Sequence, residues 1–356
     1  MFNDIYRGKR VLVTGHSGFK GSWLTMWLGR LGAELCGVSL PPETEPNHFR
    51  LLNPPGRSEW CDIRDAEKLG SVLREFRPEI IFHLAAQPLV RLSYRKPVDT
   101  LAVNVGGTVN LLEAARNVPE LRAVVVVTSD KCYRNSEKAE GYRENDPLGG
   151  YDPYSASKGC QELVAASYRD SFLRAAGVGL ATARAGNVIG GGDWAADRLV
   201  PDLVRAAAAG AVELLRSPSA VRPWQHVLEP LGGYLLLGQR LLEGDAAAAS
   251  AWNFGPETAD ALTVGEVAAL MNRFWPRVGF RFAPPADAPH ETKLLRLDCT
   301  KAARDLGWRG VWNAEECIRR TAGWYRGYYD SGRINTAADL EAYVADAARK
   351  GLSWTN

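Results

Sequence analysis

Residues 11–21 read VLVTGHSGFKG, and this stretch decides the fold. It follows a short β-branched run (Arg10–Val13) and leads into Phe19–Leu31, where apolar residues recur at helical spacing. Glycines spaced G-x-x-G-x-x-G allow a tight strand-to-helix turn, whose backbone N–H groups approach a pyrophosphate at the positive end of the helix. The candidate cofactor-binding turn comprises Gly15, His16, Gly18, Phe19 and Gly21.

Beyond this turn, the first half of the chain alternates strand and helix patterns. Further strands are expected at Glu34–Leu40, Ile80–Leu84, Ala123–Thr128 and Val178–Ala185, and further helices at Asp65–Phe76, Asn104–Asn117 and Tyr154–Leu173. The run AVVVVT at 123–128 is apolar throughout, as in a strand buried on both faces. The alternation predicts an α/β fold, a doubly wound parallel sheet of Rossmann-like type.

After Asn187 the pattern loosens into loops. Helices are expected at Leu228–Leu242, Val264–Phe274 and Ala314–Tyr328, with short strands at Glu213–Arg216 and Trp252–Phe254. We expect residues 1–187 to form an NAD-binding domain. Residues 188–356 would form most of a smaller, mixed substrate-binding lobe, with an interleaved boundary.

The second strand bears on the choice of cofactor. In many folds of this kind an acid at its end holds the adenosine ribose, but here Ser39-Leu40 is followed by two prolines. No arginine stands there to bind a 2′-phosphate, so NAD is favoured over NADP. The third and fourth strands are followed by further cofactor candidates, namely Asp62, Ile63, Leu84, Ala85, Ala86 and Gln87. Asp62 as a solvated turn residue, and the alanines as room for helix packing, stay open as alternatives.

The sequence Tyr154-Ser-Ala-Ser-Lys158 opens a predicted helix, so its tyrosine and lysine share one helix face. A lysine ammonium one turn away can stabilise a phenolate, whose unperturbed pKa is ~10. Ser129 follows the buried fifth strand, where its hydroxyl can share a hydrogen bond with the same substrate group. A solvated helix face is the alternative for Tyr154 and Lys158. His83 is expected to be a hydrogen-bonded core residue.

These motifs resemble the extended short-chain dehydrogenase/reductase family over nearly the whole chain. The shared residues are Gly15-x-x-Gly18-x-x-Gly21, Ala85-Ala86-Gln87, Ser129 and Tyr154-x-x-x-Lys158. Longer stretches narrow the resemblance: TGHSGFKGSW, HLAAQPLVRLSY, TSDKCY, GGYDPYSASKG, ARAGNVIGGGDW and RPWQHVLEPLGGYL. In this order they are similar to bacterial CDP-glucose 4,6-dehydratases.

The resemblance implies a lyase that converts CDP-glucose to CDP-4-keto-6-deoxyglucose and water. Tyr154 would take the proton of the hexose 4-hydroxyl while hydride passes from C4 to NAD⁺. Lys158 would lower the pKa of the tyrosine, and Ser129 would orient the hydroxyl. Water is then lost across C5 and C6, and the hydride returns to C6, so NAD is regenerated in each turnover.

Asp130 and Lys131 are assigned by the resemblance to the elimination. A carboxyl whose pKa is raised by burial can protonate the departing C6 hydroxyl. The related dTDP-glucose dehydratases carry Asp-Glu where this chain has Asp130-Lys131, which leaves the identity of the C5 base open. Lys131 is either that base, with a strongly depressed pKa, or an ion-pair partner of Asp130 or of a phosphate.

Asn187, Arg198 and Arg222 are the candidates to hold the substrate diphosphate, because they lie in stretches shared with the family. A guanidinium donates two parallel hydrogen bonds to phosphate. No residue identifies cytosine, so the choice of CDP-glucose rests on the resemblance. Another NAD-dependent nucleotide-sugar dehydratase or epimerase of the same fold stays an alternative, as does a non-catalytic NAD-binding regulator, which would not be expected to keep both Tyr154 and Lys158.

Composition narrows the function further. The 356 residues carry a formal net charge of +2 without a long basic run, so charge gives no support to a nucleic-acid or membrane partner. No apolar run approaches the ~20 residues of a membrane span, and the N-terminus lacks an apolar signal segment, so a cytoplasmic location is expected. The six cysteines and five histidines are dispersed, which predicts free thiols and no metal. The family also implies a homodimer or higher homo-oligomer.

Overall fold

The computed structural model describes residues 1–138, 140–215, 217–256, 261–282 and 294–356. Its centre is a sheet of seven parallel strands in the order β11-β6-β5-β4-β1-β2-β3, which confirms the predicted fold class. The strands are β1 (Arg10–Thr14), β2 (Glu34–Ser39), β3 (Arg57–Trp60), β4 (Ile80–His83), β5 (Ala123–Val127), β6 (Gly179–Ala185) and β11 (Ala251–Phe254).

One strand corrects the expected lobe assignment. The strand predicted at Trp252–Phe254 pairs with β6 in the main sheet, with Trp252 opposite Ala183, instead of lying in the smaller lobe. Helix α9 (Leu228–Leu242) is buried along nearly its whole length and returns the chain across the sheet to β11. This crossover places β11 parallel to β6. The sheet therefore draws on residues from both sides of residue 187.

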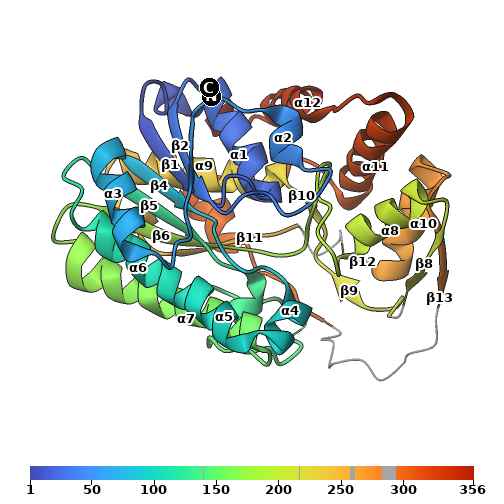
Figure 1. The fold of residues 1–356 in the computed structure, drawn as a ribbon, viewed down its shortest axis with the longest axis horizontal. Helices are drawn as coiled ribbons and strands as arrows, with labels where there is room; N and C mark the ends of the chain where they lie inside the picture. Colours follow the sequence, from blue (N-terminus) through green and yellow to red (C-terminus); the bar gives the residue numbers. More distant parts are fainter. Residues whose placement is uncertain (139, 216, 257–260, 283–293) are drawn as a thin grey trace.

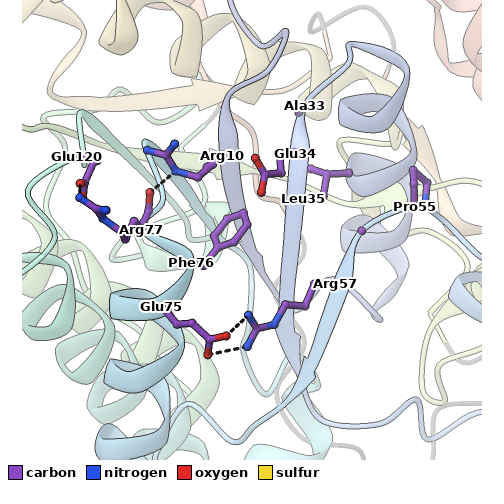
Figure 2. A pocket seen from close by; sticks show the side chains of 11 residues that line it. Arg10, Ala33, Glu34, Leu35, Pro55, Arg57, Glu75, Phe76, Arg77 and Glu120 are labelled. Carbon is purple, nitrogen blue, oxygen red and sulfur yellow. Dashed lines mark hydrogen bonds and ion pairs between the residues drawn. The ribbon is translucent and has the colours of Figure 1, made fainter.

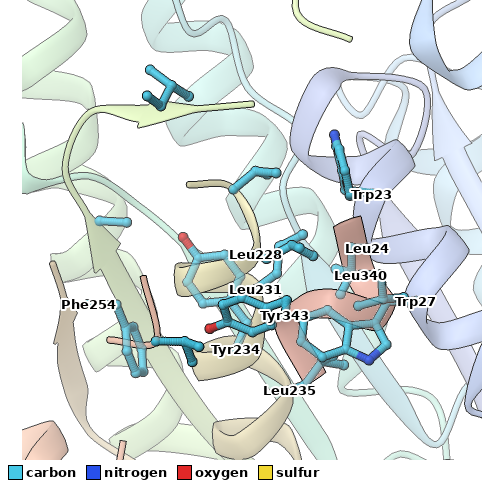
Figure 3. Packing of buried hydrophobic residues seen from close by; sticks show 14 of the residues in the cluster. Trp23, Leu24, Trp27, Leu228, Leu231, Tyr234, Leu235, Phe254, Leu340 and Tyr343 are labelled. Carbon is cyan, nitrogen blue, oxygen red and sulfur yellow. The ribbon is translucent and has the colours of Figure 1, made fainter. Parts of the chain in front are cut away.

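Helices cover both faces of the sheet (Figure 1). One face packs against α3 (Ala66–Phe76), α6 (Gly107–Ala115) and α7 (Pro153–Tyr168). The other packs against α1 (Phe19–Arg30) and α9, and α12 (Thr336–Arg349) packs on α1. In this second layer the Trp27 ring of α1 contacts Tyr343 of α12, with ring centres 5.9 Å apart, beside the α9 leucines, as Figure 3 shows. Apolar side chains on both faces explain the unbroken apolar runs of the central strands.

Caps fix where the helices near the site begin. The Asp152 carboxylate accepts from the Ser155 N–H at 2.9 Å, and Pro153 takes the first helical position of α7. The helix expected at 104–117 instead begins with a π-helical turn, Ala102–Gly106, before α6. The helix expected to reach Leu173 changes from α to π at Arg169. Turns of π type widen a helix locally and are frequent at functional sites.

The smaller lobe is built around three helices, α8 (Leu199–Ala208), α10 (Val264–Phe274) and α11 (Ala314–Ser331). Its short strands are β7 (Val188–Ile189), β8 (Val212–Leu215), β9 (Val221–Arg222), β10 (Gln225–His226), β12 (Leu262–Thr263) and β13 (Gly279–Phe282). Arg216, at the end of an expected strand, lies outside the described residues.

Several helices were not expected from the sequence. Helix α8 lies where the sequence predicts loops. Its Pro201 is compatible with the helix, because a proline in the first helical turn removes an N–H that has no acceptor there. Helix α12 is rich in alanine and carries few large apolar residues. The remaining short helices are α2 (His48–Leu52), α4 (Val90–Arg95) and α5 (Pro97–Leu101). Within the described ranges, every helix is too short or too polar to cross a membrane.

Candidate active site

The glycine turn lies where the strand order reverses. β1 and β4 are neighbours, and the chain leaves them in opposite directions across the sheet, which opens a crevice at their carboxyl ends. Gly15 has φ +73°, and a Cβ added there would lie 2.8 Å from the Ala85 nitrogen. A Cβ on Gly21 would collide with the Gly15 carbonyl. Both glycines are therefore required for the close packing of turn, helix α1 and β4.

Thr14 ties the end of β4 to this turn. Its hydroxyl oxygen accepts from the N–H groups of Leu84 and Ala85, each at 3.1 Å, and it contacts His83 Nδ1 at 2.7 Å. His83 is fully buried, as expected for a core histidine, and burial lowers its pKa to about 3. The resulting surface is bare backbone that ends at a helix N-terminus, which fits a dinucleotide pyrophosphate.

His16 does not direct its side chain into this turn. The ring packs over Gly37 of β2 and lies within hydrogen-bond distance of the Ser39 and Ser58 hydroxyls, at 3.1 and 3.0 Å. Burial lowers its pKa to about 4, so the ring is neutral near pH 7. A role for His16 in cofactor binding therefore depends on its backbone.

Asp62 and Ile63, predicted to meet the adenine, both have protein partners. Asp62 pairs with Arg64 at 2.7 Å, and hydrogen bonds from that side chain lower the pKa of the carboxyl. Ile63 is buried in the apolar core and packs against Gly107. Their assignment to the cofactor stays a prediction.

Gln87 is held by a residue that the sequence did not single out. Asn104, in the π-helical turn, accepts from the Gln87 N–H at 2.7 Å and donates to the Ser157 hydroxyl at 2.8 Å. The Gln87 amide group donates to Leu89 O and Thr100 Oγ1. Asn104 thus joins the loop after β4 to helix α7, which carries the candidate catalytic pair.

The structure brings the predicted oxidation residues together. The Lys158 ammonium lies 6.0 Å from the centre of the Tyr154 ring, and the Ser129 side chain is close enough to the phenol to lower its pKa. Burial raises the pKa of Tyr154 to about 12, although Ser129 and Arg198 oppose the shift. Burial, reinforced by the charge of Lys20, lowers the pKa of Lys158 to about 7. The protein alone therefore keeps the phenol protonated near neutrality.

Asp130 is a buried carboxyl beside this group. It is 1% exposed, and its Oδ1 accepts from the Ser129 hydroxyl at 2.9 Å. Its Oδ2 has no hydrogen-bond partner in the part of the chain that the structure describes. Lys131 is partly exposed, and its ammonium lies 3.9 Å from Asp130 Oδ1, at the outer limit of an ion pair. A buried carboxyl oxygen without a protein partner is able to accept a hydrogen bond from a bound ligand.

The three substrate candidates lie just after β6 or in the smaller lobe. Asn187 follows β6, and a Cβ on its neighbour Gly186 would lie 3.2 Å from Asp130 Oδ2 and 2.7 Å from the Pro223 ring. Arg222 precedes that proline, on β9. Arg198 caps the start of α8 and is close enough to Tyr154 to lower the pKa of the phenol.

Two charged residues of the site were missed by sequence reasoning. Lys20, between Gly18 and Gly21, has no ion-pair or hydrogen-bond partner among the described residues. Burial and the positive charge of Arg198 lower its pKa to about 8. Asp193 is 5% exposed and accepts from Arg198 at 2.9 Å, which orients that arginine. A lysine inside a glycine turn was a readable signal for Lys20, whereas nothing in the sequence marked Asp193.

A cavity of about 810 Å³ lies at the amino-terminal ends of the sheet strands, on the side of the sheet opposite the glycine turn. Its lining side chains are drawn in Figure 2. Arg10, Glu34 and Arg57 open their respective strands and line it. Arg57 is paired with Glu75 at 2.7 Å, and Arg77 is paired with Glu120. In the described ranges, no group of three or more His, Cys, Asp or Glu side chains is placed to hold a metal ion.

The sheet, the glycine turn at its switch point and the Ser129, Tyr154 and Lys158 side chains together define the extended short-chain dehydrogenase/reductase class. Solved structures share this fold. An epimerase from Methanothermobacter thermautotrophicus is 26% identical, with a TM-score of 0.80 over 92% of this chain and 96% of that one. The UDP-glucose 4-epimerase of Thermus thermophilus, solved with NAD, is 26% identical, with a TM-score of 0.77 over 89% and 99%.

Sequence comparison narrows the class to one family. The family model described as GDP-mannose 4,6 dehydratase matches residues 12–321. A CDP-glucose 4,6-dehydratase of Salmonella typhimurium is 50% identical over 332 residues, covering 91% of this chain and 92% of that protein. The chain belongs to this family of nucleotide-sugar 4,6-dehydratases, which confirms the resemblance found in its motifs.

Proposed function

We propose that this protein is an NAD-dependent CDP-glucose 4,6-dehydratase, which forms CDP-4-keto-6-deoxyglucose and water. The observation that carries the proposal is the buried Asp130 carboxyl, which lies beside Ser129 and Tyr154 with one oxygen unbonded. An epimerase needs only to oxidise and reduce C4, whereas a dehydratase must also protonate a departing hydroxyl. The 50% identity to the Salmonella enzyme supports CDP-glucose as the substrate.

NAD is the proposed cofactor, held by the glycine turn and by the small residues Ala85 and Ala86. NAD supplies reversible hydride storage and a positive charge when bound. The chain contributes backbone N–H groups at the start of α1 and the ammonium of Lys20, which we add to the candidate residues because none of the described residues pairs with it or hydrogen-bonds to it. The absence of an arginine after β2 supports NAD over NADP.

Tyr154 is the proposed base for the 4-hydroxyl, with Ser129 sharing its hydrogen bond. Burial raises the pKa of Tyr154 to about 12, so the phenolate requires nearby positive charge. Lys158 and Arg198 supply part of it from the protein. The carboxylate of Asp130 acts against it and raises the pKa of the phenol. Asp130 can protonate the leaving hydroxyl only in its neutral form. In that form it no longer raises the pKa of the Tyr154 phenol.

The C5 base stays open between two roles for Lys131. Its partly exposed ammonium and the long 3.9 Å contact with Asp130 leave it able to turn toward a bound sugar. Loss of solvent deuterium exchange at C5 in Lys131→Ala would identify it as the base. Retained exchange would leave it the role of an ion-pair partner.

The substrate diphosphate is assigned to Arg198 and Arg222, with Asn187 nearby. The Arg222–Pro223 segment approaches Gly186 and hence Asp130, so a sugar diphosphate held by these arginines places its hexose near the buried carboxyl.

A panel of sugar nucleotides tests the proposal. Purified protein is given NAD with CDP-, dTDP-, UDP- or GDP-glucose, and the 4-keto product is followed. The highest kcat/KM is expected with CDP-glucose. Equal or better turnover of another nucleotide would overturn the substrate assignment, and a C4 epimer without loss of water would favour the epimerase alternative.

We also propose that the chain forms a homodimer through α6 and α7, the helices at 104–117 and 154–173 that the family implies, together with the neighbouring α5. Val98 of α5 is 77% exposed and Leu163 of α7 is 61% exposed, on helices that are in contact with each other. Exposed apolar side chains on adjoining helices are typical of association sites. Replacing both residues with glutamate should produce monomers in analytical ultracentrifugation. A cytoplasmic location stays a prediction.

A further inference from the structure

Five buried polar side chains form a continuous path from the glycine turn to the catalytic lysine. They are 3% exposed or less, and they belong to β1, β4, α6 and α7: Thr14, His83, Thr108, Gln161 and Lys158. The Lys158 ammonium donates to the Gln161 amide oxygen at 2.7 Å, and the Gln161 amide nitrogen donates to the Thr108 hydroxyl oxygen at 2.7 Å. His83 Nε2 lies 3.0 Å from the same hydroxyl.

The direction of every hydrogen bond in this path can be assigned from Thr108. Its hydroxyl donates to the Asn104 carbonyl at 2.7 Å, so its oxygen must accept from both Gln161 and His83. His83 is therefore protonated on Nε2, and its Nδ1 accepts from the Thr14 hydroxyl. Thr14 then keeps its lone pairs for the Leu84 and Ala85 N–H groups. A buried threonine thus dictates which end of the Gln161 amide group faces Lys158.

We propose that Gln161 is a positioning residue for Lys158: its amide oxygen, fixed through Thr108 and His83, sets the place and the charge state of the catalytic ammonium. The proposal rests on the role proposed above for Lys158 in oxidation. Among the described residues the other acceptor of the ammonium is the Val127 carbonyl, at 3.4 Å, so both acceptors are neutral. Titratable groups that face Lys158 from the surrounding elements are Lys20, His83, Cys132, Tyr154 and Glu162.

The uncharged Gln161 amide oxygen affects the pKa of Lys158 differently from a carboxylate. Burial and Lys20 lower the pKa of Lys158 to about 7, while Glu162 acts in the opposite direction. The Glu162 carboxylate is itself paired with Arg184 at 2.7 Å. An amide oxygen orders the ammonium without adding negative charge, whereas a carboxylate in its place would raise the pKa of Lys158 and also that of Tyr154. Glutamine therefore leaves the pKa values of Lys158 and Tyr154 closer to neutral pH than glutamate would.

The test is the pKa of Lys158 in protein free of NAD and substrate. It is read from the side-chain NMR signal of [¹³C]lysine-labelled protein, assigned with Lys158→Met. In Gln161→Glu the pKa should rise by about 1–3 units, because an opposite charge lies in contact. In Gln161→Met it should fall, because the charged form loses its acceptor. Gln239→Glu makes the same charge change on α9, where that amide donates to Glu243, and should leave Lys158 unaltered.

The pH profile of kcat/KM provides a second measurement. Gln161→Glu should move the alkaline limb to higher pH, because Lys158 then holds its proton longer, and Gln161→Met should move it to lower pH. An unchanged pKa of Lys158 in both variants would overturn the inference, even if the enzyme proves to be a dehydratase. Should glutamate prevent folding, Gln161→Met decides alone. Because the NMR titration needs no turnover, failure of the proposed function leaves its result valid.

Discussion

The amino-terminal and carboxyl-terminal ends of the sheet strands, called here the amino edge and the carboxyl edge, both carry clusters of charge. The charges are arranged differently at the two edges. At the amino edge, Arg57 and Arg77 each pair with a glutamate around a sizeable cavity. At the carboxyl edge, Lys20 has no partner among the described residues, Lys158 contacts only neutral acceptors, and one Asp130 oxygen is unbonded. Charges that neutralise one another serve the fold, whereas unsatisfied charges require a ligand.

Cavity size alone would therefore mislead. The amino-edge cavity has room for a small molecule, yet the cations that line it are already committed to carboxylates or to backbone, as Arg10 is to the Arg77 carbonyl at 2.7 Å. The carboxyl edge combines bare backbone at a helix N-terminus with buried titratable groups. The following changes test this contrast between the two edges.

Tyr154→Phe should have the largest effect. It removes the proposed base for the 4-hydroxyl, so both product formation and the transient NADH absorbance should disappear. Binding of CDP-glucose, measured by calorimetry, should persist. Normal turnover in this variant would contradict the whole assignment of the carboxyl edge.

Asp130→Asn should separate the two halves of the reaction. Tyr154 and Lys158 remain, so NADH absorbance should appear on mixing with substrate, while elimination slows by ~10²–10⁴-fold because the general acid is lost. Stopped-flow absorbance and product analysis measure the two steps. If oxidation and elimination fall together, Asp130 has no separate role in elimination.

Arg198→Ala should weaken substrate binding by about 1.5–3 kcal/mol, because a charged hydrogen bond to phosphate is lost. Lys20→Met should weaken the binding of NAD. Separate titrations with CDP-glucose and with NAD distinguish the effects of these two substitutions. An unaltered KM for CDP-glucose would remove Arg198 from the substrate site. Unaltered NAD affinity would leave Lys20 without its proposed ligand.

Arg57→Ala, at the amino edge, should have the smallest effect. Its pair with Glu75 is exposed, and such pairs contribute little to stability. We expect unchanged kcat/KM and nearly unchanged thermal unfolding. A large loss of activity would show that the amino edge takes part in function.

Much of this arrangement could be predicted from local patterns. The glycine turn and the buried run of β5 are patterns within a few residues, so the parallel α/β sheet and the Tyr154–Lys158 pair could be predicted from the sequence. Contacts between distant segments could not be predicted in this way. Examples are the union of β11 with β6, the burial of the His16 ring against Gly37, and the path from Gln161 to Thr14, which join residues far apart in the chain.

The most direct test of the central claim is one incubation of the protein with NAD and CDP-glucose in D₂O, analysed by mass spectrometry and NMR. A dehydratase at the carboxyl edge predicts a CDP-linked 4-keto-6-deoxy sugar that has lost water and carries deuterium at C5, because the C5 proton is abstracted and replaced from solvent. Recovery of unlabelled CDP-glucose, or of a C4 epimer that retains its C6 hydroxyl, would contradict it.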